Sequence, residues 1–154
     1  MAKSCVGGCL CGALRYEFTT EPTTVYICHC MECQKISSSA FGVSVRVSAD
    51  SFNITQGERK SIETVADSGR TKTGFFCPEC GIRIINKPNS GDLVVIKAGT
   101  LDNPNLFRPI AHIWTQSAQS WFPFADGLPK FKKAPEDVKE LNKLWSNNIL
   151  KAIQ

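Results

Sequence analysis

The sequence predicts a mainly β protein that ends in a short helix. Three observations support this class: segments with a two-residue hydrophobic period, turn residues between these segments, and a helical pattern confined to the C-terminus. The 154 residues are enough for one domain with its own core. The chain has no internal repeat of the length that solenoids and propellers need, so we expect a single β-sheet domain rather than a repeat protein.

Two stretches show the strand pattern most clearly. Leu14, Tyr16 and Phe18 alternate with charged residues, and every second residue from Val43 to Val47 is a valine. Successive side chains of a strand face opposite sides of a sheet, so both patterns predict half-buried strands of antiparallel sheets. Shorter segments between Gly, Asn, Asp and Pro turns predict further strands at 25–28, 52–55, 61–66, 72–76, 83–86, 93–97 and 111–115.

The helical pattern occupies residues 135–154. Pro135 suits the first position of a helix, and Glu136 and Asp137 suit its N-terminal turn. We therefore divide the chain into a domain over residues 1–134 and a C-terminal helix over residues 135–154 that packs on the same domain. The apolar face of this helix consists of Val138, Leu141, Leu144 and Trp145.

Composition and charge exclude several classes of protein. Hydrophobic residues make up 42% and charged residues 21%, as in ordinary globular proteins. No segment has the uninterrupted apolar length of a membrane span, and the N-terminus lacks the apolar block of a secretory signal. The net charge is only +4, and no Lys/Arg-rich recognition helix lies beside the cysteines. We expect a cytoplasmic protein without nucleic-acid or membrane partners.

Eight cysteines are the unusual feature of the composition. Disulfides are rare in the reducing cytoplasm, so cysteines at such short spacings indicate metal sites. Apart from Cys5, they form three clusters: Cys9-Leu10-Cys11, Cys28-His29-Cys30-Met31-Glu32-Cys33 and Cys77-Pro78-Glu79-Cys80.

The third cluster has the pattern of a metal-binding turn. Its proline limits the backbone and the following Gly81 permits a positive φ, so two sulfurs can converge on one ion. A closed zinc site needs four ligands, and a second pair of cysteines must therefore join. Residues two apart on a strand project to the same side, so the first cluster can supply this pair, as can Cys28 with Cys30. Spacing alone does not choose between them.

If the first cluster completes that site, Cys28, Cys30 and Cys33 remain as a group of three sulfurs. Three protein ligands leave zinc an open coordination position, which is typical of catalytic rather than structural sites. Two alternatives stay open at this point. Cys5 or His29 supplies a fourth ligand and closes the site, or Cys30 and Cys33 form a redox pair.

Several segments carry a resemblance to a known family: Gly7-Gly8-Cys9-Leu10-Cys11-Gly12, Cys28-His29-Cys30-Met31-Glu32-Cys33-Gln34-Lys35, Phe76-Cys77-Pro78-Glu79-Cys80-Gly81, Gly99-Thr100-Leu101-Asp102, His112-Ile113-Trp114 and Trp121. They are similar to the motifs of the glutathione-dependent formaldehyde-activating enzyme (GFA) family, which includes centromere protein V. The resemblance covers about residues 5 to 131 and implies two antiparallel sheets in a tent-like, zinc-binding fold. It implies two zinc ions, a structural one on Cys9, Cys11, Cys77 and Cys80, and a catalytic one on Cys28, Cys30 and Cys33.

The resemblance also implies a carbon–sulfur lyase or synthase that acts on S-hydroxymethylglutathione, with glutathione or another small thiol as partner. The residues are consistent with this chemistry, because a zinc ion with three thiolates acidifies water poorly and suits a soft sulfur ligand. Glutathione is an anion, so Lys35 and Arg46, the cations nearest in sequence, are candidate substrate residues. The rival class is a non-enzymatic zinc-binding interaction module of the same fold.

Three further positions bear on the site. After the second motif the family commonly has Ser-Gly, whereas this chain has Ser37-Ser38-Ser39, so the resemblance does not carry over the shape of this loop. We interpret His29 as a hydrogen-bonded neighbour of the cysteines and His112, which lies in an apolar run, as a core residue with its polar atoms paired.

Overall fold

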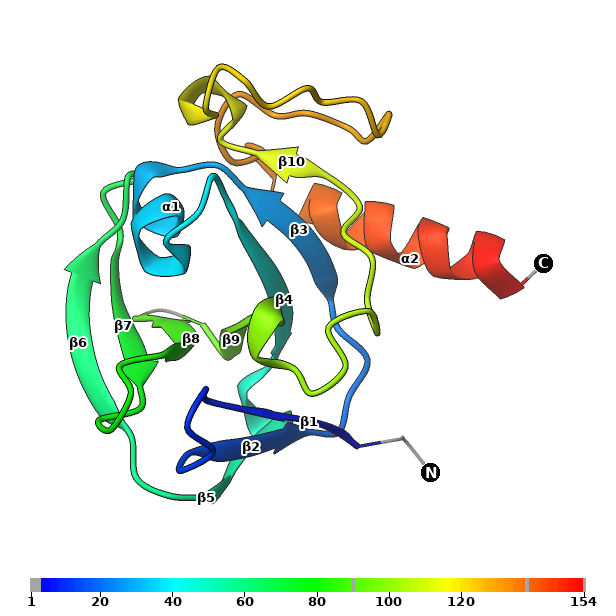
Figure 1. Ribbon diagram of the computed structural model, residues 1–154. Helices are drawn as coiled ribbons and strands as arrows, with labels where there is room; N and C mark the ends of the chain where they lie inside the picture. The colour runs from blue at the N-terminus through cyan, green and yellow to red at the C-terminus, as the bar shows by residue number, and fades with distance from the viewer. Residues whose placement is uncertain (1–3, 90, 138, 154) are drawn as a thin grey trace. The chain divides into compact units, whose positions relative to one another are not determined.

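The computed structural model describes residues 4–89, 91–137 and 139–153. Its helices are α1 (Met31–Ser37) and α2 (Lys139–Ile153). Its strands are β1 (Cys5–Gly8), β2 (Arg15–Phe18), β3 (Thr24–Cys28), β4 (Gly42–Ser48), β5 (Phe52–Gln56), β6 (Lys60–Val65), β7 (Thr71–Phe76), β8 (Arg83–Pro88), β9 (Leu93–Lys97) and β10 (His112–Ile113). They form two sheets, in the orders β1-β2-β5 and β10-β3-β4-β9-β8-β7-β6 (Figure 1). The predicted class, mainly β with two sheets and a C-terminal helix, is confirmed.

The described chain divides into two compact units, and β4 runs through the boundary between them. The first unit comprises residues 4–22 and 45–106, and the second comprises residues 23–44 and 107–153. Each cysteine cluster lies wholly within one unit. The division of the sequence into 1–134 and 135–154 stays a prediction.

Antiparallel ladders build the first unit, in which β2 pairs with both β1 and β5. The sequence analysis did not predict β1, because its two glycines disfavour a strand. The structure explains one of them: a Cβ added at Gly7 would overlap the hydroxyl of Tyr16 and the carbonyl oxygen of Thr100. The Tyr16 and Thr100 hydroxyls hydrogen-bond at 2.8 Å. Gly7 therefore allows β1 to lie close over this partly buried pair.

In the second unit, β3 is buried along its whole length and pairs with β10 in parallel. The prediction of wholly antiparallel sheets is wrong at this pair. The reason is the connection, because a tight hairpin forces antiparallel pairing, whereas the long segment between these two strands permits the parallel one. Helix α2 packs against β3.

Helix α2 starts at Lys139, later than the predicted start at Pro135. The cause is local capping: the Asp137 side chain accepts a hydrogen bond from the Lys139 N–H at 2.9 Å, and the Asp137 carbonyl accepts one from Glu140. The predicted apolar face is partly confirmed, since Leu141 and Trp145 are buried. Val138 lies outside the described residues. No helix of the described chain is long and apolar enough to cross a membrane.

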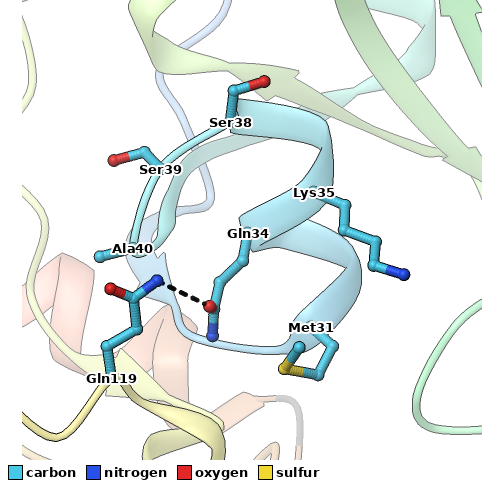
Figure 2. A pocket seen from close by; sticks show the side chains of 7 residues that line it. All are labelled: Met31, Gln34, Lys35, Ser38, Ser39, Ala40 and Gln119. Carbon is cyan, nitrogen blue, oxygen red and sulfur yellow. Dashed lines mark hydrogen bonds between the residues drawn. The ribbon is translucent and has the colours of Figure 1, made fainter.

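The sequence analysis missed α1, because seven residues are too few for a helical period to be evident. The sulfur of Cys30 caps its first turn by accepting a hydrogen bond from the Cys33 N–H at 3.4 Å. At the other end of α1 lies Ser38 (Figure 2). It adopts a left-handed conformation with φ of 52°, and its N–H donates to the carbonyls of Gln34 and Lys35. Glycine usually adopts this conformation at the C-terminal end of a helix. Here Ser38 adopts it and ends α1 in the same way.

Replacing Ser38 with glycine is expected to stabilise the protein by up to about 1 kcal/mol. Glycine removes the steric cost of the left-handed conformation, which is partly offset by its greater freedom in the unfolded chain. Urea denaturation measures the change, with Ser39→Gly as the matched control. Ser39 has no positive φ, so its glycine variant is expected to be slightly less stable than the unaltered protein. Equal destabilisation by both variants would contradict this account of the helix end.

Candidate metal centres

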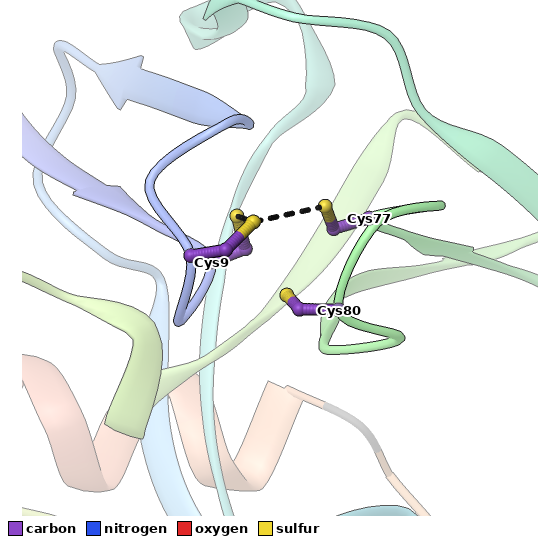
Figure 3. Close-up of side chains that lie close together, drawn as sticks. Cys9, Cys77 and Cys80 are labelled. Atoms are coloured by element: carbon purple, nitrogen blue, oxygen red, sulfur yellow. Dashed lines mark hydrogen bonds between the residues drawn. The ribbon is translucent and has the colours of Figure 1, made fainter.

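Four cysteines converge between two turns of the first unit (Figure 3). Cys9 and Cys11 lie in the turn between β1 and β2, and Cys77 and Cys80 lie in the turn between β7 and β8. All four sulfurs lie within 4.8 Å of one another. Gly81 has the positive φ, 76°, that the sequence predicted for the second turn. The Cys9–Cys11 pair is held by a turn, so the prediction that a strand presents it is wrong.

The sulfur spacing fits a tetrahedral zinc ion. Zinc–sulfur bonds of about 2.3 Å place the sulfurs of a tetrahedron about 3.8 Å apart. The Cys9 and Cys11 sulfurs are 3.5 Å apart, and those of Cys11 and Cys77 are 3.8 Å apart. The Leu14 N–H also donates to the Cys9 sulfur at 3.2 Å. These contacts orient the donor atoms as a structural zinc site requires.

The protonation of these sulfurs also favours a cation. Backbone N–H groups of Ile82 and Cys11 lower the pKa of Cys80 to about 6. A backbone hydrogen bond from Ala13 acts to lower the pKa of Cys11, but the shared hydrogen bond with Cys9 and partial burial outweigh it and raise that pKa to about 12. The four sulfurs therefore resist simultaneous ionisation on their own, and a divalent cation would supply the charge that permits it.

The second group consists of Cys28, Cys30 and Cys33, all buried in the second unit. Cys28 ends β3, Cys30 caps α1 and Cys33 lies in its first turn. The three sulfurs lie within 4.8 Å of one another. Cys28 and Cys30 converge as predicted. The prediction that one strand presents both is wrong, since the chain leaves β3 after Cys28 and the helix cap places the other two sulfurs.

The pKa of Cys28 is raised well above its usual range. Hydrogen bonds shared with Cys30 and Cys33 are the main cause, followed by burial and by the charges of the same two sulfurs. Three thiolates this close and this buried need a cation to balance them. The donor set is soft, which suits zinc among the common divalent metals.

No His, Asp, Glu or further Cys of the described chain joins the three sulfurs within this distance. Cys5 lies in β1, and the Nε2 atom of His29 lies 2.9 Å from Nδ1 of His112. Neither alternative fourth ligand belongs to the group, since no ring nitrogen of His29 and no sulfur of Cys5 lies within this distance of all three sulfurs. None of the eight cysteines forms a disulfide.

Both histidines are buried and hydrogen-bonded, as the sequence predicted. His29 and His112 are fully buried, and Nε2 of His112 lies 2.7 Å from Oδ2 of Asp126. Burial is the main cause that lowers the pKa of His29, followed by the charge of His112. This pairing was not predictable from local sequence patterns, because 83 positions separate the two histidines.

A pocket of about 370 Å³ opens beside α1 in the second unit (Figure 2). Gln34 and Gln119 lie against each other in its wall, since Gln119 Nε2 donates to Gln34 Oε1 at 3.1 Å. Gln34 Nε2 in turn donates to the carbonyls of His29 and Ser117, both at 2.9 Å. The lining residues are Met31, Gln34, Lys35, Ser38, Ser39, Ala40 and Gln119.

The two predicted substrate cations lie in different places. Lys35 is exposed and lines this pocket. Arg46 is a half-buried residue of β4 in the first unit, and it does not line the pocket. Sequence reasoning missed Gln34 and Gln119 as lining residues. Gln34 directly follows Cys33 in the second motif, which was the available signal, whereas Gln119 had none.

Comparison with known proteins agrees with this arrangement of cysteines. The family model described as "Glutathione-dependent formaldehyde-activating enzyme" (GFA) matches residues 4–117. A crystal structure of a Rhodobacter sphaeroides protein, a structural genomics target, is similar in fold, with a TM-score of 0.50 and 15% sequence identity. The similarity covers 82% of this chain and 98% of that one. With its family match over most of the chain and both cysteine groups in place, the chain belongs to the glutathione-dependent formaldehyde-activating enzyme family.

Proposed function

We propose that the protein is a zinc-dependent carbon–sulfur lyase or synthase that acts on S-hydroxymethylglutathione, the adduct of glutathione and formaldehyde, or on the adduct of a related thiol. We further propose two zinc ions, a structural one on Cys9, Cys11, Cys77 and Cys80, and a catalytic one on Cys28, Cys30 and Cys33. Membership of the GFA family supports the substrate, and the two cysteine groups support the metal.

The observation that carries this proposal is the difference between the two groups. One offers four sulfurs and the other offers three, with no further metal-binding side chain of the described chain beside it. Four ligands close a tetrahedral ion, whereas three leave one position for a substrate. Bound by Cys28, Cys30 and Cys33, zinc would supply a Lewis acid that favours the deprotonated form of a substrate thiol.

The three cysteines of the second group determine which substrate suits the site. Their thiolates outweigh the charge of a divalent ion, so the centre would carry net negative charge and would activate water less well than a three-histidine site. Soft thiolate donors match a soft sulfur ligand. The residues therefore favour thiol chemistry over hydrolysis.

The pocket beside α1, the helix that carries Cys33, suits a polar, peptide-like ligand, and none of the three cysteines lines it. Its wall combines the Lys35 ammonium, the Ser38 and Ser39 hydroxyls and the Gln119 side-chain amide. These groups can pair with carboxylates and peptide groups of the kind that glutathione carries. We assign Lys35 to the binding of the substrate's carboxylate. Arg46, which lies outside this pocket, is the weaker of the two candidates.

The absence of disulfides among the eight cysteines supports a reducing compartment, and we propose the cytoplasm. We propose no nucleic-acid partner, because the net charge is only +4 and the sequence places no Lys/Arg-rich recognition helix beside the cysteines. A small thiol is the partner that the site favours.

The rate of adduct formation tests the proposed activity. Glutathione and formaldehyde combine without a catalyst, so the measurement is the exchange rate between free and bound formaldehyde, by NMR, above the spontaneous rate. The zinc-loaded protein is expected to accelerate this exchange in both directions, whereas Cys30→Ser is expected to match the spontaneous rate. Equal rates with and without the unaltered protein would contradict the activity and favour a non-enzymatic zinc-binding module.

A further inference from the structure

His29 connects Cys28 to Cys30, and nearly all of its polar atoms are held in place. Its N–H donates to the carbonyl of Ile113 at 3.0 Å, and its carbonyl accepts from Gln34 Nε2 at 2.9 Å. The backbone of residue 29 sets the directions of the side chains on both sides of it. Contacts that hold His29 in place therefore also hold the relative orientation of the Cys28 and Cys30 sulfurs.

The His29 ring is the first member of a hydrogen-bonded chain that leads to the surface. Nε2 of His29 lies 2.9 Å from Nδ1 of His112, and Nε2 of His112 lies 2.7 Å from Oδ2 of Asp126. A carboxylate only accepts hydrogen bonds, so Nε2–H of His112 donates to Asp126. With both rings neutral, Nδ1 of His112 then accepts from Nε2–H of His29. Asp126 thus sets which nitrogen donates and which accepts in both hydrogen bonds of this series.

Asp126 favours its ionised form, the carboxylate that accepts the hydrogen bond from His112. Partial burial acts to raise its pKa, but hydrogen bonds from His112 and the Leu128 N–H outweigh burial and lower it. Its side chain is 41% exposed, whereas both imidazoles are fully buried. Of these three hydrogen-bonded residues, Asp126 is therefore the one that can be replaced without opening a cavity in the core.

Three phenylalanine rings surround His29 and restrict its rotation. The ring centroids of Phe41, Phe122 and Phe124 lie 5.7, 5.0 and 5.2 Å from that of His29. Phe124 also packs on His112, and its backbone φ of 44° is rare for an aromatic residue. The loop that carries Phe124 and Asp126 is held in an unfavourable conformation in which both reach the histidines.

We propose that His112 and Asp126 are positioning residues for the three-cysteine centre, which act through His29 on the directions of the Cys28 and Cys30 sulfurs. This proposal rests on the proposed function only in that the centre must bind a metal ion. Outer hydrogen-bond partners of metal ligands typically change metal affinity by about 10- to 100-fold. Asp126 acts from further out, through His112 and His29, so we expect an effect of about tenfold, at the lower end of this range, confined to one of the two centres.

The test measures the affinity of each centre for Co²⁺ by competition with a chelator. Thiolate-to-cobalt absorption reports both centres, and comparison with Cys30→Ser, which keeps only the four-cysteine group intact, isolates the contribution of the three-cysteine centre. Asp126→Ala is expected to weaken Co²⁺ binding there by about tenfold and to leave the four-cysteine centre unchanged. Asp126→Glu, which keeps an acceptor, is expected to restore most of the affinity.

Asp102→Ala is the matched control, since the Asp102 side chain is 45% exposed and pairs with Arg15 in the first unit. It is expected to leave the three-cysteine centre unchanged. Equal Co²⁺ affinity of this centre in Asp126→Ala and the unaltered protein would overturn the positioning role, as would equal weakening of both centres. Failure of the unaltered centre to bind any metal would instead overturn the proposed function, and the positioning role with it.

Discussion

Replacement of Cys77 with serine is expected to unfold the protein or abolish its expression. Cys77 is fully buried and is one of the four sulfurs that converge between two turns. A structural zinc site contributes on the order of 10 kcal/mol to folding. This is comparable to the entire stability of a typical domain, about 5–15 kcal/mol. Circular dichroism and urea denaturation of the purified variant would measure the loss.

Cys5→Ser is the control for this prediction. Cys5 is a partly buried cysteine of β1 in the same unit, but it belongs to neither cysteine group. We expect this variant to unfold at nearly the same urea concentration as the unaltered protein. A Cys77→Ser protein with an unchanged unfolding transition would show that the four-cysteine group does not support the fold.

Replacement of Cys33 with serine is expected to leave the protein folded and to reduce its activity to the spontaneous rate. Serine preserves the size of the side chain within α1, so the helix and its packing remain. The site loses one of only three sulfurs, and a hydroxyl is a poor substitute for a thiolate as zinc ligand. Circular dichroism would report the fold, and formaldehyde exchange by NMR would report the activity.

The comparison of Cys33→Ser with Cys77→Ser separates a catalytic centre from an architectural one. If both variants collapse alike, both metals serve the fold, and the enzyme interpretation loses its main support. If Cys33→Ser is folded and fully active, the three cysteines take no part in the reaction.

The resemblance to the family implied the grouping of the cysteines, which spacing alone left open, but it did not imply the local structure that groups them. Spacing identified the turn around Cys77 and Cys80, because a proline and a glycine mark it directly. The same reasoning assigned Cys28 and Cys30 to one strand, whereas they lie on either side of a strand end and a helix cap. A two-residue spacing is compatible with both arrangements, and a helix of seven residues leaves no clear period.

The other features that could not be predicted are side-chain contacts between residues far apart in the sequence. The contact between His29 and His112 joins positions 83 apart and depends on the parallel pairing of β3 with β10. Gln119 reaches Gln34 through the loop that follows β10. Both contacts arise from tertiary packing, which local pattern and propensity do not contain. Among the predicted substrate cations, sequence proximity could not distinguish the pocket-lining Lys35 from Arg46.

X-ray absorption at the zinc edge, with and without glutathione, tests the central claim most directly. The account predicts two zinc ions per chain, one with four cysteine sulfurs and one with three, and a rise in sulfur coordination when glutathione is added. A spectrum that already shows two ions fully surrounded by protein ligands, and that glutathione leaves unchanged, would contradict it.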